Sequence, residues 1–210
     1  MMIRDTAGLT GFSRRPQAKG ERYPEARLLF MLAMATLPLL IMLPFRKDYL
    51  SLWNSTSFVG VMFIFNGTVL YICERMLPGK KGLGRMRIPD ALIIGICQAV
   101  AIIPGLSRLA LTVTAGEAEG FQKNYSIRFG MLLAIPALFG AFILSLADAA
   151  IAGIDTAYMT VYLAGGGAAL VTAFFSVYGF RRLVRRRGFG GLAYYSWVIG
   201  VLSIILTLIF

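Results

Sequence analysis

Residues 99–114 read AVAIIPGLSRLALTVT, and this stretch decides how the chain is organised. Two apolar runs meet there at a break that carries Pro104, Gly105, Ser107 and Arg108. Proline removes a backbone hydrogen bond and its ring clashes with the preceding helical turn, while glycine permits backbone angles that other residues avoid. Irregular backbone inside a membrane persists only where protein or a watery cavity covers it. The stretch therefore predicts two half-helices that meet at a break within the membrane.

The overall composition is that of an integral membrane protein. Hydrophobic residues make up 58% of the chain and the mean hydropathy is +0.73, whereas a soluble domain is about 45–50% apolar. The net charge of +11 is carried largely by short basic segments beside apolar runs, where orientation in the membrane and contact with anionic lipid explain it. No basic groove pattern indicates nucleic acid as a partner. We expect an all-α, polytopic helical bundle.

The residue types limit the chemistry of any active site. The sequence contains no histidine, so hydrolysis would have to use carboxylates, hydroxyls, arginine or a bound ion. Cys73 and Cys97 lie in apolar segments without metal-ligand spacing, which is typical of small core residues.

The apolar runs divide the chain into an arm and one membrane domain. Residues 1–27 are polar and rich in arginine, and are expected to form a cytoplasmic arm. They lack the apolar core of a secretory signal peptide. Residues 28–210 are expected to form a single polytopic membrane domain. Apolar runs predict membrane spans over residues 28–45, 58–77, 129–146, 157–180 and 192–210.

The distribution of charge predicts how the broken stretch sits in the membrane. Each apolar half of residues 88–116 is short for a crossing, which favours a re-entrant hairpin; two complete spans are the alternative. The basic loops 80–87 and 181–187 are expected to be cytoplasmic, and the acidic loop 148–155 external. These sides agree only if residues 88–116 enter and leave on the cytoplasmic side or cross an even number of times.

Arg108 is the principal candidate for a functional residue. An ionisable side chain inside the membrane marks a functional site by default, and a planar guanidinium can donate two parallel hydrogen bonds to a phosphate or carboxylate. Ser107, Thr112 and free amides at the helix end would add donors. The alternative is an arginine that snorkels or caps carbonyls of the broken helix.

Other polar residues flank the break. Gln98 lies one or two helical turns before it, and either binds substrate or ties two helices together. Glu117 and Glu119 follow the second half-helix and could ligate a metal, although a solvated loop end is the simpler interpretation.

The segment IGICQAVAIIPGLSRLALT (residues 94–112) resembles the second motif of the bacterial undecaprenyl-diphosphatase family, of the bacitracin-resistance type. The family pattern is approximately G-x-x-Q-x-x-A-x-x-P-G-x-S-R-S-G-x-T. Residues 128–144 and 188–202 are similar to the family's next helix and its C-terminal segment, and residues 28–77 to the preceding pair of helices. The resemblance covers about residues 28–210.

This resemblance implies a fold and an activity. The fold would consist of two inverted repeats whose re-entrant hairpins meet near the middle of a bacterial plasma membrane. The activity would be removal of the terminal phosphate of undecaprenyl diphosphate, which recycles the carrier lipid for cell-wall synthesis. The expected partners are the polyprenyl diphosphate, the membrane and a second copy of the chain in a homodimer. The catalytic residues would be Arg108, Ser107 and Thr112, and the substrate-binding residues Arg108, Ser107, Gln98 and Gly105.

The chain also departs from the family pattern. The glutamate-rich motif of the first repeat, with its histidine, does not occur in these 210 residues, and the chain is expected to begin where that repeat has ended. Leu109 and Ala110 replace the usual serine and glycine, while Glu117 and Glu119 stand where the family is apolar. If the chain is active, magnesium or calcium is the expected cofactor, with Glu117 and Glu119 as candidate ligands.

Three functions follow from these observations. The first is a lipid diphosphate phosphatase of this family. The second is a non-catalytic relative that binds or translocates a polyprenyl phosphate or diphosphate, since transporters also hold anions at broken helices. The third is an incomplete member that needs a partner to supply the first repeat.

Overall fold

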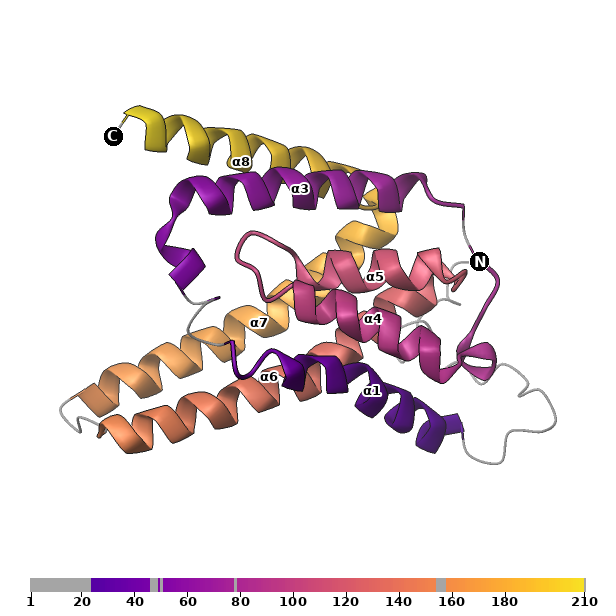
Figure 1. The fold of residues 1–210 in the computed structure, drawn as a ribbon, viewed down its shortest axis with the longest axis horizontal. Helices are drawn as coiled ribbons and strands as arrows, with labels where there is room; N and C mark the ends of the chain where they lie inside the picture. Colours follow the sequence, from indigo (N-terminus) through magenta and orange to yellow (C-terminus); the bar gives the residue numbers. More distant parts are fainter. Residues whose placement is uncertain (1–23, 46–48, 50, 78, 154–157, 210) are drawn as a thin grey trace, which may run out of the picture.

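The computed structural model describes residues 24–45, 49, 51–77, 79–153 and 158–209, and its described residues form helices joined by short connections (Figure 1). The α-helices are α1 (Pro24–Ile41), α3 (Thr56–Arg75), α4 (Ile88–Val100), α5 (Arg108–Ala118), α6 (Lys123–Ala152), α7 (Met159–Arg187) and α8 (Gly190–Ile209), with 3-10 turns η2 (Leu52–Asn54) and η3 (Leu83–Arg85). No β-strand occurs among these residues, so the all-α prediction is confirmed.

Four helices of the described part are long and apolar enough to cross a membrane: α3, α6, α7 and α8. The chain is therefore a polytopic, multi-pass membrane protein. Helix α1 is not among the four; it contains residues 28–41 of the predicted span over residues 28–45, and the predicted end at Phe45 is wrong. The helix already includes Glu25 in its first turn, where a negative charge favours the helix dipole. It ends at Ile41, ahead of Pro44, and Met42 N–H turns back to Leu39 O at 3.1 Å.

Connections between helices are shorter than the apolar runs predict, because helices extend beyond those runs. Helix α6 continues through the acidic segment to Ala152, so residues 148–152 of the predicted loop are helical, and residues 154–157 lie outside the described residues. Helix α7 continues through the arginine cluster to Arg187. Only residues 119–122 separate α5 from α6. A helix satisfies its own backbone, so it can leave the apolar layer; α6, with 30 residues, is about 45 Å long.

The predicted break is confirmed. Helix α4 ends at Val100 and α5 begins at Arg108, and the two short helices run antiparallel as a hairpin (Figure 1). Residues 101–107 form the turn, in which Ile102 N–H donates to Ala99 O at 3.2 Å. A location inside the membrane with both ends on one side remains a prediction from the charge pattern.

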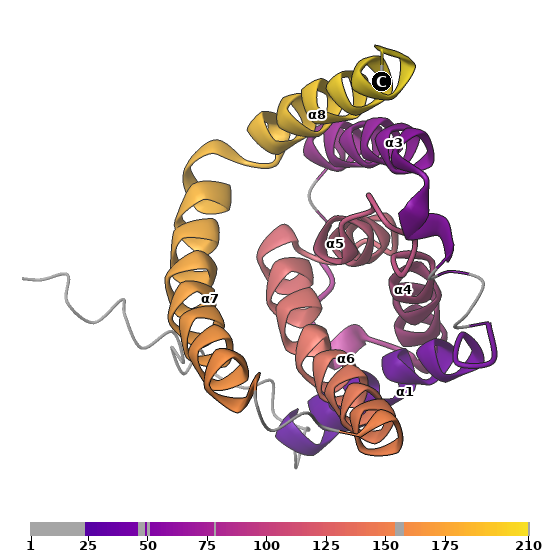
Figure 2. The ribbon, with the colours of Figure 1, turned by 90° about the vertical axis from the view of Figure 1, so that its left-hand side faces the viewer.

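Two helix pairs hold this hairpin in the bundle. Helices α3 and α8 lie side by side, and α1 packs on α4 (Figures 1 and 2). One hydrophobic cluster joins α1, α4 and α6, and another joins α3, α5 and the start of α8. Where α3 meets α8, a Cβ atom added to Gly200 would lie 2.6 Å from Gly60 O. Small residues therefore set the close approach of these two helices.

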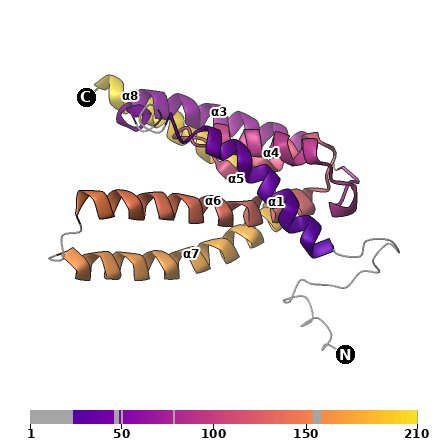
Figure 3. The same ribbon diagram turned by 60° about the horizontal axis from the view of Figure 1, so that its bottom comes forward.

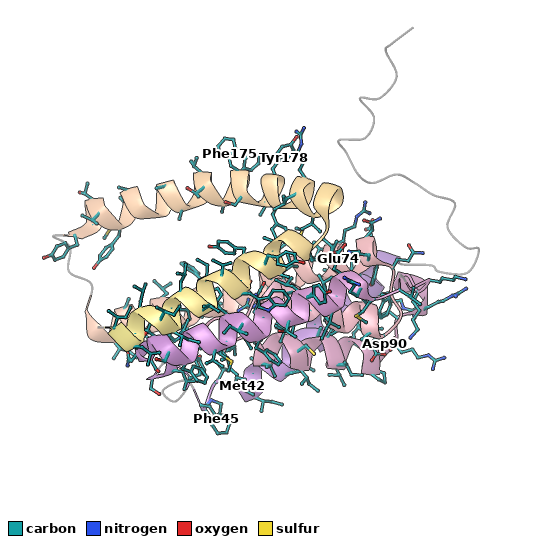
Figure 4. All side chains as sticks on the ribbon, turned by 90° about the horizontal axis from the view of Figure 1, so that it is seen from above. Met42, Phe45, Glu74, Asp90, Phe175 and Tyr178 are labelled. Atoms are coloured by element: carbon teal, nitrogen blue, oxygen red, sulfur yellow. The ribbon has the colours of Figure 1, made fainter. Side chains whose placement is uncertain are left out.

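Helix α7 stands apart from the bundle. Every residue from 158 to 179 is exposed, and Figures 2 and 3 show α7 antiparallel to α6 at one side of the other helices. Phe175 and Tyr178 project from it away from the bundle (Figure 4). Apolar side chains around the whole helix are suited to a lipid environment. The last turns of α7 reach the core at Val184, which is 5% exposed.

The contact between α3 and α8 can be tested with a matched pair of glycines. We expect Gly200→Ala to lower the midpoint of thermal unfolding in detergent by several degrees, because its Cβ would clash with Gly60 O. In α7, a Cβ added at Gly166 meets no atom within 4 Å. Gly166→Ala should therefore leave the midpoint unchanged or raise it, since alanine is more favourable than glycine in a helix by about 1 kcal/mol. Equal midpoints for the two variants would contradict the packing described.

Candidate functional site at the helix break

The N-terminus of α5 opens into the break. Ser107 is its N-cap, and Ser107 Oγ accepts a hydrogen bond from Ala110 N–H at 3.3 Å. Arg108 is the first residue of the helix. The first amides of a helix lack partners within the helix and carry a partial positive charge, so they attract anions. The break thus combines a helix N-terminus, a hydroxyl group and a guanidinium.

Asn66 of α3 holds this break in place. Its side chain is buried; Oδ1 accepts a hydrogen bond from Ser107 N–H at 2.8 Å, and Nδ2 donates to Ser196 Oγ of α8 at 3.1 Å. A single amide therefore ties the cap of α5 to α3 and α8. Asn66 was not among the predicted site residues, although an asparagine within an apolar run is a signal of helix-to-helix hydrogen bonding.

Gly105 is required by the shape of the turn. Its φ is +91°, a conformation that favours glycine, and a Cβ there would lie 2.7 Å from Val59 O of α3. The turn therefore presses against the backbone of α3. This close contact accounts for Gly105 by packing, while its predicted part in substrate binding remains a prediction.

Arg108 is half-buried, and no described carboxylate lies within ion-pair distance of its guanidinium. A partly desolvated cation is costly without a counter-charge. The arrangement therefore suits an incoming anion whose oxygens accept hydrogen bonds from the guanidinium and from the start of α5. No described carbonyl accepts a hydrogen bond from the Arg108 guanidinium, so carbonyl capping is not seen among these residues, while snorkelling stays an alternative.

Thr112 is placed in a helix contact. Its side chain is 1% exposed, and its hydroxyl donates to Arg108 O at 2.9 Å, with Leu109 O at 3.2 Å. A Cβ on Gly130 of α6 would lie 2.8 Å from Thr112 Oγ1. The hydroxyl is thus satisfied within α5 at the contact with α6. The structure does not join it with Ser107 as a second donor.

Gln98 is the clearest unsatisfied group near the hairpin. Its side chain is 0% exposed, and neither its Oε1 nor its Nε2 has a hydrogen-bond partner in the described structure. An unsatisfied buried polar group costs about 1–3 kcal/mol. The predicted tie between helices is not seen within the described ranges. A bound ligand or water would satisfy this amide.

Glu117 and Glu119 do not share one environment. Glu117 is 4% exposed, so a solvated loop end is wrong for this residue. Burial is the main cause that raises the pKa of the Glu117 carboxyl, while Lys123 and the Cys73 thiol lower it in part. Glu119 is the C-cap of α5 and is partly exposed.

The described side chains do not form a metal centre. Within residues 24–45, 51–77, 79–153 and 158–209, no group of three or more histidine, cysteine, aspartate or glutamate side chains could hold a metal ion. Glu117 and Glu119 point to different surroundings. These residues therefore do not fit a divalent cation by themselves, and no step proposed below passes through one.

A second polar cluster, centred on Glu74, fixes the turn between α7 and α8. Glu74 Oε2 accepts hydrogen bonds from Lys123 Nζ at 2.9 Å and from Phe189 N–H at 2.6 Å. Gly188, with φ +66°, turns the chain directly against this carboxylate. Glu74 thereby fixes the end of α3 to α6 and to the start of α8; Figure 4 shows its position.

These features define a class: a polytopic all-α membrane protein built around a broken-helix hairpin. Comparison with known proteins narrows the class. The family model of bacitracin resistance protein BacA matches residues 2–202. The chain belongs to the bacitracin resistance protein BacA family.

Curated relatives agree with this assignment. A protein of Methanobrevibacter smithii named undecaprenyl-diphosphatase is 33% identical over 181 residues, which are 85% of this chain and 65% of the relative. Proteins of the same name from Methanosphaera stadtmanae and Carboxydothermus hydrogenoformans are 33% and 32% identical, over 90% and 87% of this chain and 67% and 71% of the relatives. The chain thus spans about two thirds of the length of the curated relatives it matches.

The role of Asn66 can be tested by its removal. We expect Asn66→Leu to lower stability by about 1–3 kcal/mol, because Ser107 N–H and Ser196 Oγ lose a buried partner. Thermal unfolding in detergent would measure this change. Thr172→Val is the control, because that exposed hydroxyl bonds only to Ala168 O of its own helix. A loss no larger than that of the control would contradict the role of Asn66.

Proposed function

We propose that this chain releases the terminal phosphate from a polyprenyl diphosphate, of the undecaprenyl type, in a bacterial plasma membrane. The observation that carries the proposal is Arg108, a half-buried cation without a described counter-charge at the N-terminus of α5. A diphosphate offers both the negative charge and the planar oxygen pairs that a guanidinium binds. The family and the name shared by the relatives support the same activity.

The reaction breaks one phosphoanhydride bond. Water adds to the terminal phosphorus, the bridging oxygen leaves with the lipid, and the products are inorganic phosphate and polyprenyl phosphate. Such transfer depends mainly on positioning and on stabilising charge on the phosphoryl oxygens. Arg108 and the first amides of α5 would supply that stabilisation. Ser107 Oγ accepts from Ala110 N–H, which leaves its hydroxyl hydrogen to donate to the ligand.

The re-entrant placement of α4 and α5 completes the proposal. A hairpin that enters and leaves on the cytoplasmic side would bring the charged break to a diphosphate below the lipid headgroups. Gln98 of α4, buried and unsatisfied, would then bond to substrate or to a water beside it. A requirement for magnesium or calcium is part of the proposal, and the assays below test it. A homodimer is also part of the proposal, and the mass of the purified chain in detergent would test it.

Phosphate release tests the proposal directly. With farnesyl or undecaprenyl diphosphate in detergent, we expect release by the wild type, and a loss of about 100-fold or more in Arg108→Ala, the effect of removing a main charge-stabilising donor. Arg108→Lys should recover part of the activity, because lysine keeps the positive charge but lacks the paired, planar N–H donors of the guanidinium. Arg182→Ala, a described and exposed arginine of α7, should match the wild type.

The same assay separates the alternatives. Parallel reactions with magnesium, calcium and EDTA show whether a divalent ion is required. Ligand binding that depends on Arg108 without phosphate release would identify a binder or transporter instead of a phosphatase. Activity restored only by a co-expressed first repeat would identify an incomplete member. The names of the relatives favour turnover over both alternatives.

Gln98 is expected to separate binding from stability. In Gln98→Leu an apolar side chain of similar size replaces an amide without partners, so the midpoint of thermal unfolding should stay level or rise. Substrate binding should weaken about tenfold, the loss of one or two hydrogen bonds. Thermal unfolding and the KM for phosphate release measure the two effects. A strong loss of stability with an unchanged KM would show that the amide is structural.

A further inference from the structure

A basic cavity lies at the other end of α4. It has a volume of about 480 Å³ and is lined by Arg27, Lys81, Gly84, Arg85, Arg87 and Asp90. Four of these side chains are cations, and Asp90 is the one carboxylate among them. The lining comes from α1, from the segment before α4 and from α4 itself. Such an excess of positive charge in a hollow favours an anion.

The wall of the cavity is fixed by contacts on both sides. Arg27 Nη2 donates to Met86 O at 2.9 Å, and the Met86 side chain is fully buried. Lys81 N–H donates to Gly120 O at 2.9 Å, and Lys81 O accepts from Gln122 N–H at 3.0 Å. The basic segment is therefore bound to α1 and to the α5–α6 connection. These contacts hold the basic segment in a fixed position around the cavity.

The single carboxylate is already engaged. Asp90 Oδ2 accepts a hydrogen bond from Arg87 N–H at 2.8 Å, and Asp90 Oδ1 lies 3.9 Å from Lys81 Nζ. Arg85 and Arg87 are exposed, and no carboxylate of the described ranges lies within ion-pair distance of either guanidinium. Neither cation is therefore neutralised by a described carboxylate.

Exposed apolar side chains of α1 and α4 follow the cations that line the cavity. On α4, Ile88 is 45% exposed at the start of the helix, and Ile93 and Ile96, three residues apart on one face, are 40% and 55% exposed. On α1, Leu29 and Phe30 are 68% and 48% exposed. Both helices begin at the end marked by Asp90, whereas Met42 and Phe45 lie toward the other end (Figures 1 and 4). A ligand with an anionic head and apolar tails fits this combination.

We propose that the cavity binds the phosphate headgroup of an anionic membrane lipid, with its acyl chains along the exposed faces of α1 and α4. Basic pockets between membrane helices on the cytoplasmic side are suited to such headgroups. The site is separate from the helix break, because α4 has 13 residues between them and spans about 20 Å. The proposal does not depend on the phosphatase activity.

Native mass spectrometry of the full chain in detergent tests the proposal, with phosphatidylglycerol and phosphatidylcholine titrated separately. We expect the wild type to bind phosphatidylglycerol more tightly. Arg85→Gln combined with Arg87→Gln should weaken that affinity about thirtyfold and leave phosphatidylcholine unchanged. Lys80→Gln is the matched control, because Lys80 is exposed in the same segment but does not line the cavity. It should stay within about twofold of the wild type.

Three results would overturn the proposal. They are equal affinity of the wild type for the two lipids, an unchanged affinity in the double variant, and inorganic phosphate that binds through the same arginines as tightly as the lipid. The last result would identify a site for soluble phosphate. Arg108→Ala should retain phosphatidylglycerol while it loses phosphate release, so a failure of this proposal and a failure of the proposed activity are distinguishable.

Discussion

The hydrogen bond from Ser107 N–H to Asn66 Oδ1 is the contact on which the rest of the site depends. A helix that stops inside an apolar layer leaves backbone groups without partners, and these must be satisfied by protein or water. Asn66 satisfies one of them and is itself fixed by Ser196 of α8. The start of α5, and with it the position of Arg108, therefore depends on a contact between three helices and not on the hairpin alone.

The chain places positive charge at both ends of one short helix, in two different settings. At the break, Arg108 is half-buried and lies beside the first amides of α5. At the other end of α4, several exposed cations surround a wider hollow. The first setting would desolvate a ligand and suits a reacting group. The second would leave a ligand hydrated and suits a headgroup that is only bound.

Pro104, Gly105 and Arg108 are residue types that the centre of a regular membrane helix does not usually carry. They were sufficient to predict the break, its two half-helices and Arg108 as a candidate site residue. Helix ends were predicted less well, because α6 and α7 continue into polar residues that satisfy no apolar pattern. Thr112 and Glu117 were assigned to a site and to solvent, yet both are buried in helix contacts. Whether a given face of α5 is buried depends on how α3 and α6 pack against it, and local spacing does not contain this long-range information. Asn66 carried a local signal, a polar amide within an apolar run, but its partners Ser107 and Ser196 depend on the same long-range packing.

The pairing of α3 with α8 has a consequence for the order of assembly. These helices are separated by the hairpin, α6 and α7, so α3 is made long before its partner. A chain is synthesised from its N-terminus, and Asn66 Nδ2 cannot reach Ser196 until α8 has been inserted. Until then Asn66 Nδ2 lacks its partner in an incomplete bundle, although Asn66 Oδ1 can already accept from Ser107 N–H. Helix α8 thus completes the contacts that hold the break, and truncation before Ser196 would remove one of the two partners of Asn66.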